Sequence, residues 1–265
     1  MAADQTGISW TDSTWNPVTG CSKVSEGCRY CYAEALSLRF GWSRKPWAAE
    51  HAAENVVCHP DRLTQPLRWH RGRKVFVNSM SDLFHERVPD AFIADVFAVM
   101  VEAPQHIYQI LTKRPARLER FARDFGIAAQ PYIWLGVSAE DQRAADERIP
   151  LLLQTPAAVH FVSCEPLLGT VDLSRWLPAG SHAHAGGNLT HLDRSGRIDW
   201  VICGGESGPH ARPMALDWAR SLRAQCAAAG VPFFLKQLGG VRPGGAAELD
   251  GREWHELPEP EEVAR

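Results

Sequence analysis

Three cysteines lie close together near the start of the chain, at positions 21, 28 and 31. Thiolates are soft ligands that bind zinc and iron–sulfur clusters. A closed structural zinc site uses four protein ligands, whereas three leave one metal position open for a substrate or cofactor. Cys21, Cys28 and Cys31 are therefore predicted to be metal ligands.

The composition is that of an ordinary globular chain. Its 265 residues are 45% hydrophobic and 22% charged, and the formal net charge of -3 argues against a strongly basic nucleic-acid coat. The polar N-terminus lacks a secretory-signal pattern, and no apolar run reaches membrane-spanning length. We therefore expect a cytoplasmic protein without a membrane partner. In that reducing compartment clustered thiols bind metal more often than they form a disulfide framework.

Short apolar runs alternate with helical patterns along the rest of the chain. Near-continuous apolar character suits strands that are covered on both faces, as in a parallel sheet. Apolar residues at helical spacing fall in residues 90–101, 115–125, 139–153 and 216–229. The predicted strands are Ile8–Trp10, Val75–Ser79, Ile107–Leu111, Tyr132–Val137, Val159–Cys164, Trp200–Cys203 and Pro232–Leu235.

Polar residues follow these strands at their carboxyl ends, where a (β/α) barrel assembles its active site. An open doubly wound sheet would fit the number of βα units as well, but the repeated polar strand ends favour the barrel. We therefore predict an α/β fold, a partial or complete (β/α) barrel, with the three-cysteine loop after the first strand. The polar segments are Asn78–Asp82, Thr112–Arg114, Ser138–Asp141, Ser163–Glu165, Gly204–Ser207 and Lys236–Gln237.

The whole chain, residues 1–265, is predicted to be one domain. Residues 41–74, rich in Trp, His and Arg, form an excursion after the cysteine loop. Residues 178–198 are predicted to be a flexible surface loop or small flap. Residues 248–265 form an acidic, proline-containing tail.

The residues around the cysteines resemble a known family. The run from Thr6 to Cys21, followed by Gly27-Cys28 and Cys31-Tyr-Ala-Glu34, is similar to the three-Cys-motif family of phages and bacteria, whose function is unassigned. Its members are often encoded beside a dedicated partner protein, which the resemblance implies here too. The similarity extends through Phe76–Phe84, Leu111–Pro115, Trp134–Ser138, Ser163–Leu167 and Gly204–Gly208, and so covers most of the chain.

That family in turn resembles radical S-adenosylmethionine enzymes. These hold a [4Fe–4S] cluster by three cysteines on the loop after the first strand of a partial barrel, and the open iron binds S-adenosylmethionine. Cys28 and Cys31 keep the two-residue spacing of that superfamily, and Tyr30 stands at the position that lies near the adenine. The gap of six residues between Cys21 and Cys28 is wider than is usual there. The resemblance implies an enzyme that reductively cleaves S-adenosylmethionine with electrons from a donor.

Bound S-adenosylmethionine would need acceptors for its ammonium, donors for its carboxylate and partners for its ribose. Side chains at the strand ends have the required chemistry, arginine in particular for a carboxylate. The alternatives are a helix cap for Asp82 and a solvated loop for residues 113–114. The three groups are assigned to Ser81 and Asp82, to Lys113 or Arg114, and to Ser138 and Glu140, respectively.

Two further strand ends carry candidate catalytic and binding residues. Glu165 and Glu206 each follow an apolar strand in a tight turn and are expected to line the pocket mouth, where they bind substrate or cofactor. Cys164 is a candidate hydrogen-atom donor or metal ligand, with Glu165 as a second candidate catalytic residue. Core packing is the favoured alternative for Cys164 and Cys203, because free cysteines are commonly buried.

One segment of the sequence bears on the substrate. Residues 68–74 mix cations with Trp69, a composition that suits phosphate and base contacts, so a nucleic acid or nucleotide is one expectation. A basic edge leading into the strand at Val75 is an equal alternative. The alternative for the whole chain is a non-catalytic interaction protein that works with a partner protein and binds zinc or an iron–sulfur group. Its fourth zinc ligand would be a residue such as histidine.

Overall fold

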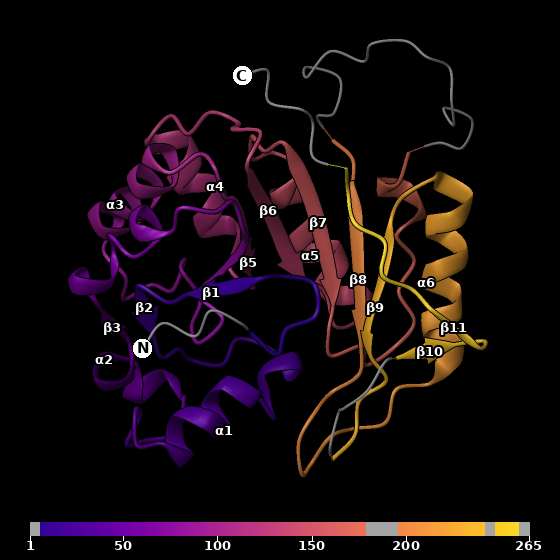
Figure 1. Ribbon diagram of the computed structural model, residues 1–265. Helices are drawn as coiled ribbons and strands as arrows, with labels where there is room; N and C mark the ends of the chain where they lie inside the picture. The colour runs from indigo at the N-terminus through magenta and orange to yellow at the C-terminus, as the bar shows by residue number, and fades with distance from the viewer. Residues whose placement is uncertain (1–5, 179–195, 242–246, 260–265) are drawn as a thin grey trace.

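A parallel sheet of seven strands forms the centre of the protein in a computed structural model that describes residues 6–178, 196–241 and 247–259. The strands are β1 (Ser13–Trp15), β4 (Lys74–Val77), β5 (Ile107–Thr112), β6 (Ile133–Ser138), β7 (Val159–Cys164), β8 (Trp200–Gly204) and β9 (Phe233–Gln237). They lie side by side in that order, and every neighbouring pair is parallel. Within the described strands β1 and β9 do not pair, so the sheet curls into an open half-barrel (Figure 1). The prediction of a single α/β domain built on a partial barrel is confirmed.

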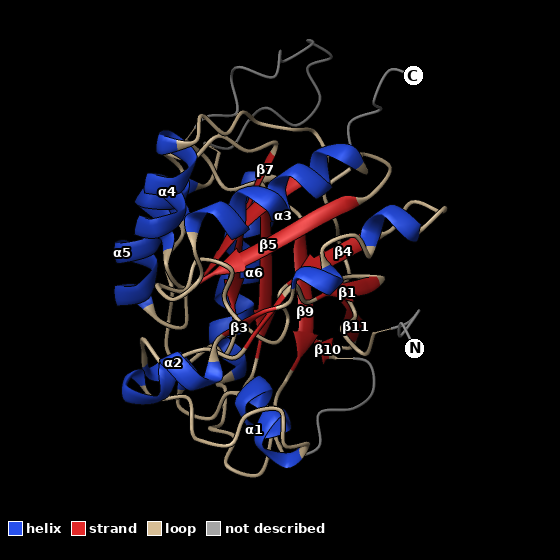
Figure 2. Ribbon diagram, turned by 90° about the vertical axis from the view of Figure 1, so that its left-hand side faces the viewer, coloured by secondary structure: helices blue, strands red, loops and turns tan. Residues whose placement is uncertain are grey.

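Four of the six α-helices in the described residues cover the convex side of this sheet. The α-helices are α1 (Tyr32–Arg39), α2 (Ala52–Asn55), α3 (Asp90–Glu102), α4 (Pro115–Asp124), α5 (Gln142–Leu152) and α6 (Leu216–Ala229). Buried residues of α3 to α6 pack with the strands in one apolar cluster, and α4 and α5 lie side by side (Figure 2). These four helices agree with the helical patterns of the sequence. No helix in the described residues is long and apolar enough to cross a membrane.

A second apolar cluster fills the concave side of the half-barrel. Alternate strand residues point to opposite faces of a sheet, so Phe161 of β7 points inward while its neighbour Val162 joins the helices. Aromatic rings dominate the inner cluster, and several contact each other edge to face or tilted. The cluster therefore closes the interior of the half-barrel. Its members are Trp10, Phe76, Trp134, Val159, Phe161, Trp200, Ile202 and Phe234.

The first strand is not where the sequence predicted it. Residues 8–10 form a turn, in which Thr11 N donates to Ile8 O at 3.3 Å, and β1 begins at Ser13. Trp10 is buried in the inner cluster, so its apolar character serves packing rather than a strand. The cysteine loop still follows the first strand, with the short β2 (Val18–Thr19) between them.

The excursion at 41–74 packs beside the cysteine loop. It contains η2 (Ala49–His51), α2, β3 (Val57–Cys58), η3 (Pro60–Arg62) and η4 (Pro66–Arg68), and β3 pairs antiparallel with β2. The predicted loop at 178–198 lies almost entirely outside the described residues; before it the chain forms η5 (Ser174–Trp176). The described part of the tail forms the β10 (Glu248–Leu249) and β11 (Arg252–Glu253) pair and packs on β9, where Leu235 N donates to Trp254 O at 2.7 Å.

A glycine in β6 makes room for the inner aromatic cluster. A Cβ added at Gly136 would lie 2.5 Å from Cε2 and Cζ of Phe161, whose ring is fully buried. Gly136→Ala is therefore expected to destabilise the fold by about 1–3 kcal/mol through overpacking. The change would appear as a lower urea midpoint at unchanged m-value.

Gly169→Ala is the matched control, because its Cβ would meet only Asp141 Cβ at 3.9 Å. Equal midpoints for the two variants would contradict the close packing of Phe161 against β6.

Candidate functional site

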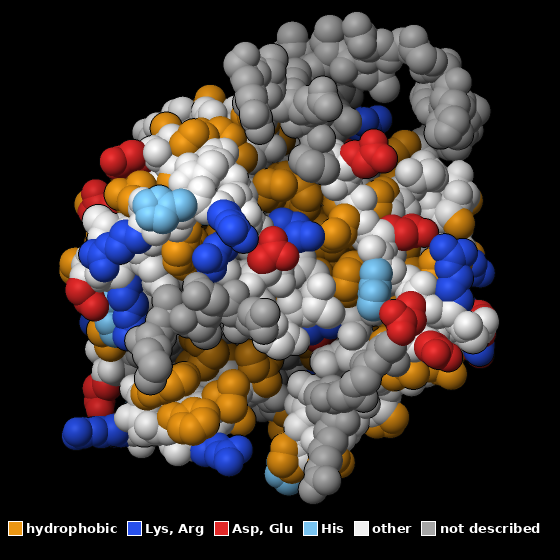
Figure 3. All heavy atoms as spheres, viewed as in Figure 1, with side chains coloured by type: hydrophobic (Ala, Val, Ile, Leu, Met, Phe, Trp, Pro, Cys, Tyr) orange, Lys and Arg blue, Asp and Glu red, His pale blue; other side chains and the backbone are white. Residues whose placement is uncertain are grey.

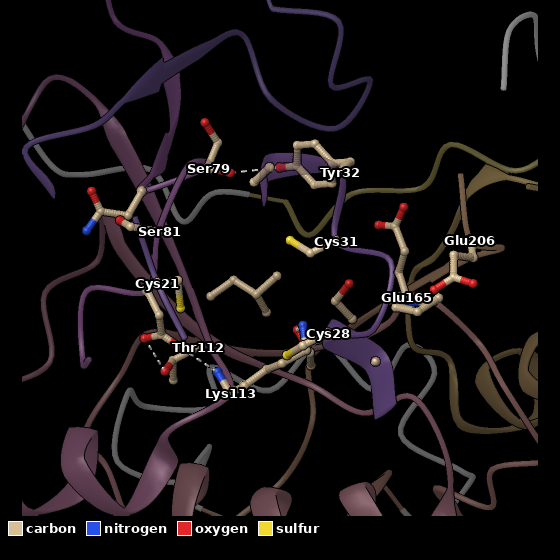
Figure 4. Close-up of a pocket in the computed structure, with 18 of the residues that line it drawn as sticks. Cys21, Cys28, Cys31, Tyr32, Ser79, Ser81, Thr112, Lys113, Glu165 and Glu206 are labelled. Atoms are coloured by element: carbon tan, nitrogen blue, oxygen red, sulfur yellow. Dashed lines mark hydrogen bonds between the residues drawn. The ribbon is translucent and has the colours of Figure 1, made fainter. Parts of the chain in front are cut away.

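An open cavity of about 170 Å³ lies at the carboxyl ends of the strands. The strands end in register, as the pairing of Ser138 with Ser163 shows, so their polar ends meet along one edge. The cysteine loop covers this edge from the other side (Figure 4). Of the predicted site residues, the cavity lining includes Cys21, Cys28, Tyr30, Cys31, Ser81, Asp82, Lys113, Arg114, Ser138, Glu165 and Glu206.

All three cysteines of the loop contribute to the cavity wall. Cys28 ends η1 (Glu26–Cys28), Cys31 is the N-cap of α1, and Figure 4 shows the three sulfur atoms directed into the same cavity. Burial raises the pKa of Cys21 to about 12. Burial also raises the pKa of Cys31, although hydrogen bonds from the N–H groups of helix α1 and the charge of Lys113 oppose the shift. All three cysteines are partly exposed, so their thiols lie at the wall of an open cavity.

The three sulfur atoms do not converge on one point. Among the described residues, no group of three or more His, Cys, Asp or Glu side chains is placed to hold a single metal ion. A zinc ion would need every sulfur at about 2.3 Å from one centre. As they stand, the thiols are arranged around a cavity instead.

Arg114 holds the first cysteine of the loop. Its guanidinium donates to Asp82 Oδ2 at 3.2 Å and to both carboxylate oxygens of Glu86, at 3.0 and 3.2 Å. The same group donates to Ser22 O at 3.0 Å and lies 3.5 Å from the sulfur of Cys21. Because its donors are engaged, Arg114 positions Cys21 and is poorly placed to take the carboxylate of a ligand.

Asp82 is likewise occupied by the protein itself. Its Oδ1 accepts hydrogen bonds from Thr112 Oγ1 at 2.7 Å and from Phe84 N at 3.0 Å. Its Oδ2 accepts from Lys113 N at 3.0 Å and from Arg114. The side chain joins the ends of β4 and β5. The helix-cap alternative is wrong, because the next helix, α3, begins at Asp90 with Pro89 as its N-cap. Contact of Asp82 with a ligand's ammonium stays a prediction.

Glu140 lies beneath the cysteine loop, and it is not among the residues that line the cavity. Its carboxylate pairs with Arg148, with nitrogen–oxygen distances of 2.8 and 3.3 Å, and both side chains are buried. Burial raises the pKa of Glu140, but Arg148 and a hydrogen bond from Ser25 outweigh it, so the net shift is downward. Gly27 packs so closely that an added Cβ would lie 2.9 Å from Glu140 Cδ. Glu140 therefore supports the loop from outside the cavity lining, and its contact with a ribose stays a prediction.

Glu206 and Arg212 fasten the other side of the loop. Two Arg212 nitrogens reach the Glu206 carboxylate at 2.6 and 2.8 Å, and Nη2 also donates to Glu26 O at 2.9 Å. The Arg212 guanidinium lies 5.3 Å from the ring centroid of Tyr30, which lines the cavity. Glu206 thus borders the cavity as expected, while its charge is neutralised by Arg212.

The remaining charged groups of the cavity differ in their pairing. Lys113 Nζ donates to Ser138 Oγ at 3.1 Å and has no carboxylate partner within the described part of the chain. Lys236 Nζ, in contrast, pairs with Glu165 Oε1 at 2.7 Å, and Gln237 Nε2 donates to the same oxygen at 2.9 Å. Lys113 is therefore the cation available to an anionic ligand.

Cys164 and Cys203 lie outside the cavity. Both are fully buried in the outer apolar cluster, and burial raises their pKa values above the usual thiol range. Ser163 and Glu165, which flank Cys164, both line the cavity, so strand alternation turns Cys164 the other way. The packing alternative accounts for the geometry of both thiols. For a catalytic role, the Cys164 thiol would have to reach the cavity from the opposite face of β7.

Sequence reasoning missed Arg148 and Arg212. Arg148 sits within α5 like any surface arginine, and Arg212 follows the irregular stretch after β8. No local sequence pattern at Arg148 or Arg212 indicates that it pairs with Glu140 or Glu206, respectively. The sequence predicts that Glu206 lines the pocket mouth, but it does not indicate the ion pair of Glu206 with Arg212. Only the approach of distant segments creates these contacts.

The buried Glu140–Arg148 pair can be tested by stability. Arg148→Met leaves the Glu140 carboxylate buried without its partner, which is expected to cost about 3–5 kcal/mol. Urea unfolding measures the loss, and the double variant Glu140→Gln/Arg148→Met should recover part of it.

Arg143→Met is the control within the same helix. Arg143 is exposed and pairs with Glu147 one turn away at 2.9 Å, an interaction worth about 0.5 kcal/mol or less. A loss for Arg148→Met no larger than that of this control would contradict the supporting role of the pair.

One family model matches residues 5–258, and it is described as "Protein of unknown function (DUF5131)". No curated protein matches the chain, and no solved structure does. The match spans nearly the whole chain, so the expectation of one uncharacterised family covering most of the sequence is confirmed.

Proposed function

We propose that this chain, which belongs to the family of unknown function matched over residues 5–258, is a radical S-adenosylmethionine-type enzyme. Cys21, Cys28 and Cys31 would hold a [4Fe–4S] cluster. The observation that carries the proposal is the placement of three thiols on the loop after the first strand of a half-barrel, facing one cavity with the polar strand ends. The substrate is unknown, and a nucleic acid or nucleotide is the candidate.

The arrangement of the thiols suits a cluster better than a zinc ion. In a cuboidal cluster each cysteine binds a different iron, so the sulfur atoms surround the group and do not converge on one point. The zinc alternative needs a fourth ligand, and no histidine lines the cavity in the described part of the chain. When bound, the cluster would supply one electron that breaks the C5′–S bond of S-adenosylmethionine, giving methionine and a 5′-deoxyadenosyl radical that takes a hydrogen atom from the substrate.

The cavity residues divide the binding of S-adenosylmethionine among them. Lys113 would bind its carboxylate, because its ammonium group lacks a carboxylate partner in the described chain whereas Arg114 is engaged. Ser81 Oγ donates to Val18 O at 2.9 Å and keeps its lone pairs free to accept from the ligand's ammonium. Ser138 accepts from Lys113 and can donate its own proton to a ribose hydroxyl.

Glu165 would contact the substrate, and Tyr30 would lie beside the adenine of S-adenosylmethionine. Glu165 faces the cavity while Lys236 and Gln237 hold one of its oxygens, so the carboxylate is fixed in place. Tyr30 contributes its ring to the cavity wall beside Arg212, in keeping with its position before the last cysteine. An external electron donor completes the proposal.

The metal content tests the proposal directly. Anaerobically purified protein is expected to be brown, with about four irons and four sulfides per chain. Replacing Cys21, Cys28 or Cys31 with Ser should abolish the cluster and the reductant-dependent formation of 5′-deoxyadenosine.

Cys58→Ser is the control, because Cys58 lies in β3 outside the cavity lining and should leave iron and sulfide unchanged. A colourless protein with one zinc per chain would overturn the proposal and favour the non-catalytic interaction protein that works with a partner protein.

Lys113 can be tested separately from the cluster. Lys113→Met removes a charge-assisted hydrogen bond to the ligand, so the affinity for S-adenosylmethionine should fall roughly 10- to 100-fold. Equilibrium dialysis measures the affinity, and the iron content should stay at the wild-type level.

Lys45→Met is the matched control, since Lys45 pairs with Glu54 outside the cavity. Equal affinities for the Lys113 and Lys45 variants would remove Lys113 from the binding site.

A further inference from the structure

Two aromatic side chains are exposed together beyond the end of α1. Phe40 is 56% exposed and Trp42 is 63% exposed, and their rings stack with centroids 5.2 Å apart and planes at 29°. Large aromatic side chains are usually buried, and an exposed apolar patch marks an interaction site. The exposed pair therefore indicates a binding site for another molecule.

The turn that carries the pair is held rigidly. Trp42 N and Ser43 N both donate to Ser37 O, at 2.8 and 3.1 Å, and Gly41 adopts a left-handed conformation with φ of 70°. The buried Trp47 donates from Nε1 to Ser43 Oγ at 3.0 Å, which ties the turn to the cavity wall. The two rings are thus presented in a preorganised arrangement, which lowers the entropy lost on binding.

Two arginines flank the aromatic pair in the sequence, Arg39 before Phe40 and Arg44 after Trp42. The Arg39 guanidinium lies 5.6 Å from the ring centroid of Phe40, and Arg44 is exposed two residues after Trp42. Neither arginine forms an ion pair with a carboxylate that the structure describes, whereas the next cation, Lys45, is paired. Figure 3 shows hydrophobic side chains gathered over α1 with basic side chains beside them. Exposed rings interleaved with free cations match the chemistry of a nucleic-acid strand, whose bases stack and whose phosphates carry charge.

Helix α1 joins this surface to the cavity. It begins at Tyr32, which lines the cavity, and ends at Arg39 after eight residues, a length of about 12 Å. Stacked nucleotides are spaced by about 3.4 Å along a strand. The length of α1 therefore corresponds to about four stacked nucleotides.

We propose that Phe40 and Trp42, with Arg39 and Arg44, form an aromatic platform that binds single-stranded nucleic acid and leads the strand toward the cavity. Binding at the platform needs no cluster, whereas the delivery of a nucleotide to the cavity rests on the function proposed above. Net repulsion from the chain's charge of -3 is offset locally, because the cations of the platform lack carboxylate partners among the described residues.

Fluorescence anisotropy with labelled dT12 tests the platform in the full-length, anaerobically purified protein. Trp42→Ala removes one stacking surface and is expected to weaken binding roughly 5- to 150-fold. Arg44→Gln should reduce the slope of log affinity against log salt by about 0.7, the value for one phosphate contact with a single strand.

Phe125→Ala is the matched control. Phe125 is also exposed, at 47%, and stacks on Phe121 beyond α4, away from α1. The Phe125→Ala variant should bind dT12 with the same affinity as the wild type. Failure of the wild type to bind dT12 at low salt, or equal binding by the Trp42 and Phe125 variants, overturns the platform. If the natural ligand of the patch is a protein and not a nucleic acid, the wild type will fail to bind dT12 at low salt.

A second measurement separates the platform from the proposed reaction. Replacing Cys21, Cys28 and Cys31 with Ser should leave dT12 binding intact, and chelator-treated wild-type protein serves the same purpose if that variant does not fold. Retained Trp42-dependent binding without any cluster supports the platform while the enzymatic proposal fails. If 5′-deoxyadenosine forms but dT12 binding does not depend on Trp42, the enzymatic proposal is supported and the platform is overturned.

Discussion

Three arginine–carboxylate contacts hold the cysteine loop against the carboxyl edge of the half-barrel, and the candidate site depends on them. Arg114 fixes Cys21 and Ser22, Arg148 with Glu140 supports the middle of the loop, and Arg212 with Glu206 fastens Glu26. Each arginine belongs to a different segment, after β5, in α5 and after β8. A short loop with little regular structure is thereby given a defined position over the cavity.

The inner aromatic cluster determines on which side the cavity opens. Rings from five of the strands, with Trp10, fill the concave side, and Gly136 leaves the space that the Phe161 ring occupies. In the described part of the chain, the cavity therefore lies between the strand ends and the cysteine loop. There Lys236 and Glu165 neutralise each other, while Lys113 remains without a carboxylate in the described chain. The cavity is thus suited to a ligand that carries an anionic group.

Helix α1 connects the two regions to which we assign function. Its N-cap is Cys31, in the cavity wall, and beyond its last residue the chain turns outward to present Phe40 and Trp42. A single rigid element therefore sets the spacing between the proposed cluster and the aromatic platform. In this arrangement a strand bound at the platform would approach the cavity along α1. The arginine contacts that hold the cysteine loop would also fix the position of α1, which begins at the end of that loop.

The sequence by itself determined the parallel α/β architecture, the position of most strands and helices, and the segments that meet at the cavity. These features follow from local patterns: apolar runs, helical spacing and polar residues after each strand. The first strand was misplaced because Trp10, apolar enough for a strand, packs into the inner cluster instead. Only the tertiary structure decided which polar residues are free to bind a ligand. Arg114 reaches a cysteine 93 residues away and Arg212 reaches Glu26 over 186 residues, so no local pattern could reveal that both are engaged. Whether a charged side chain serves a ligand or the fold depends on which distant groups the packing of the sheet brings beside it.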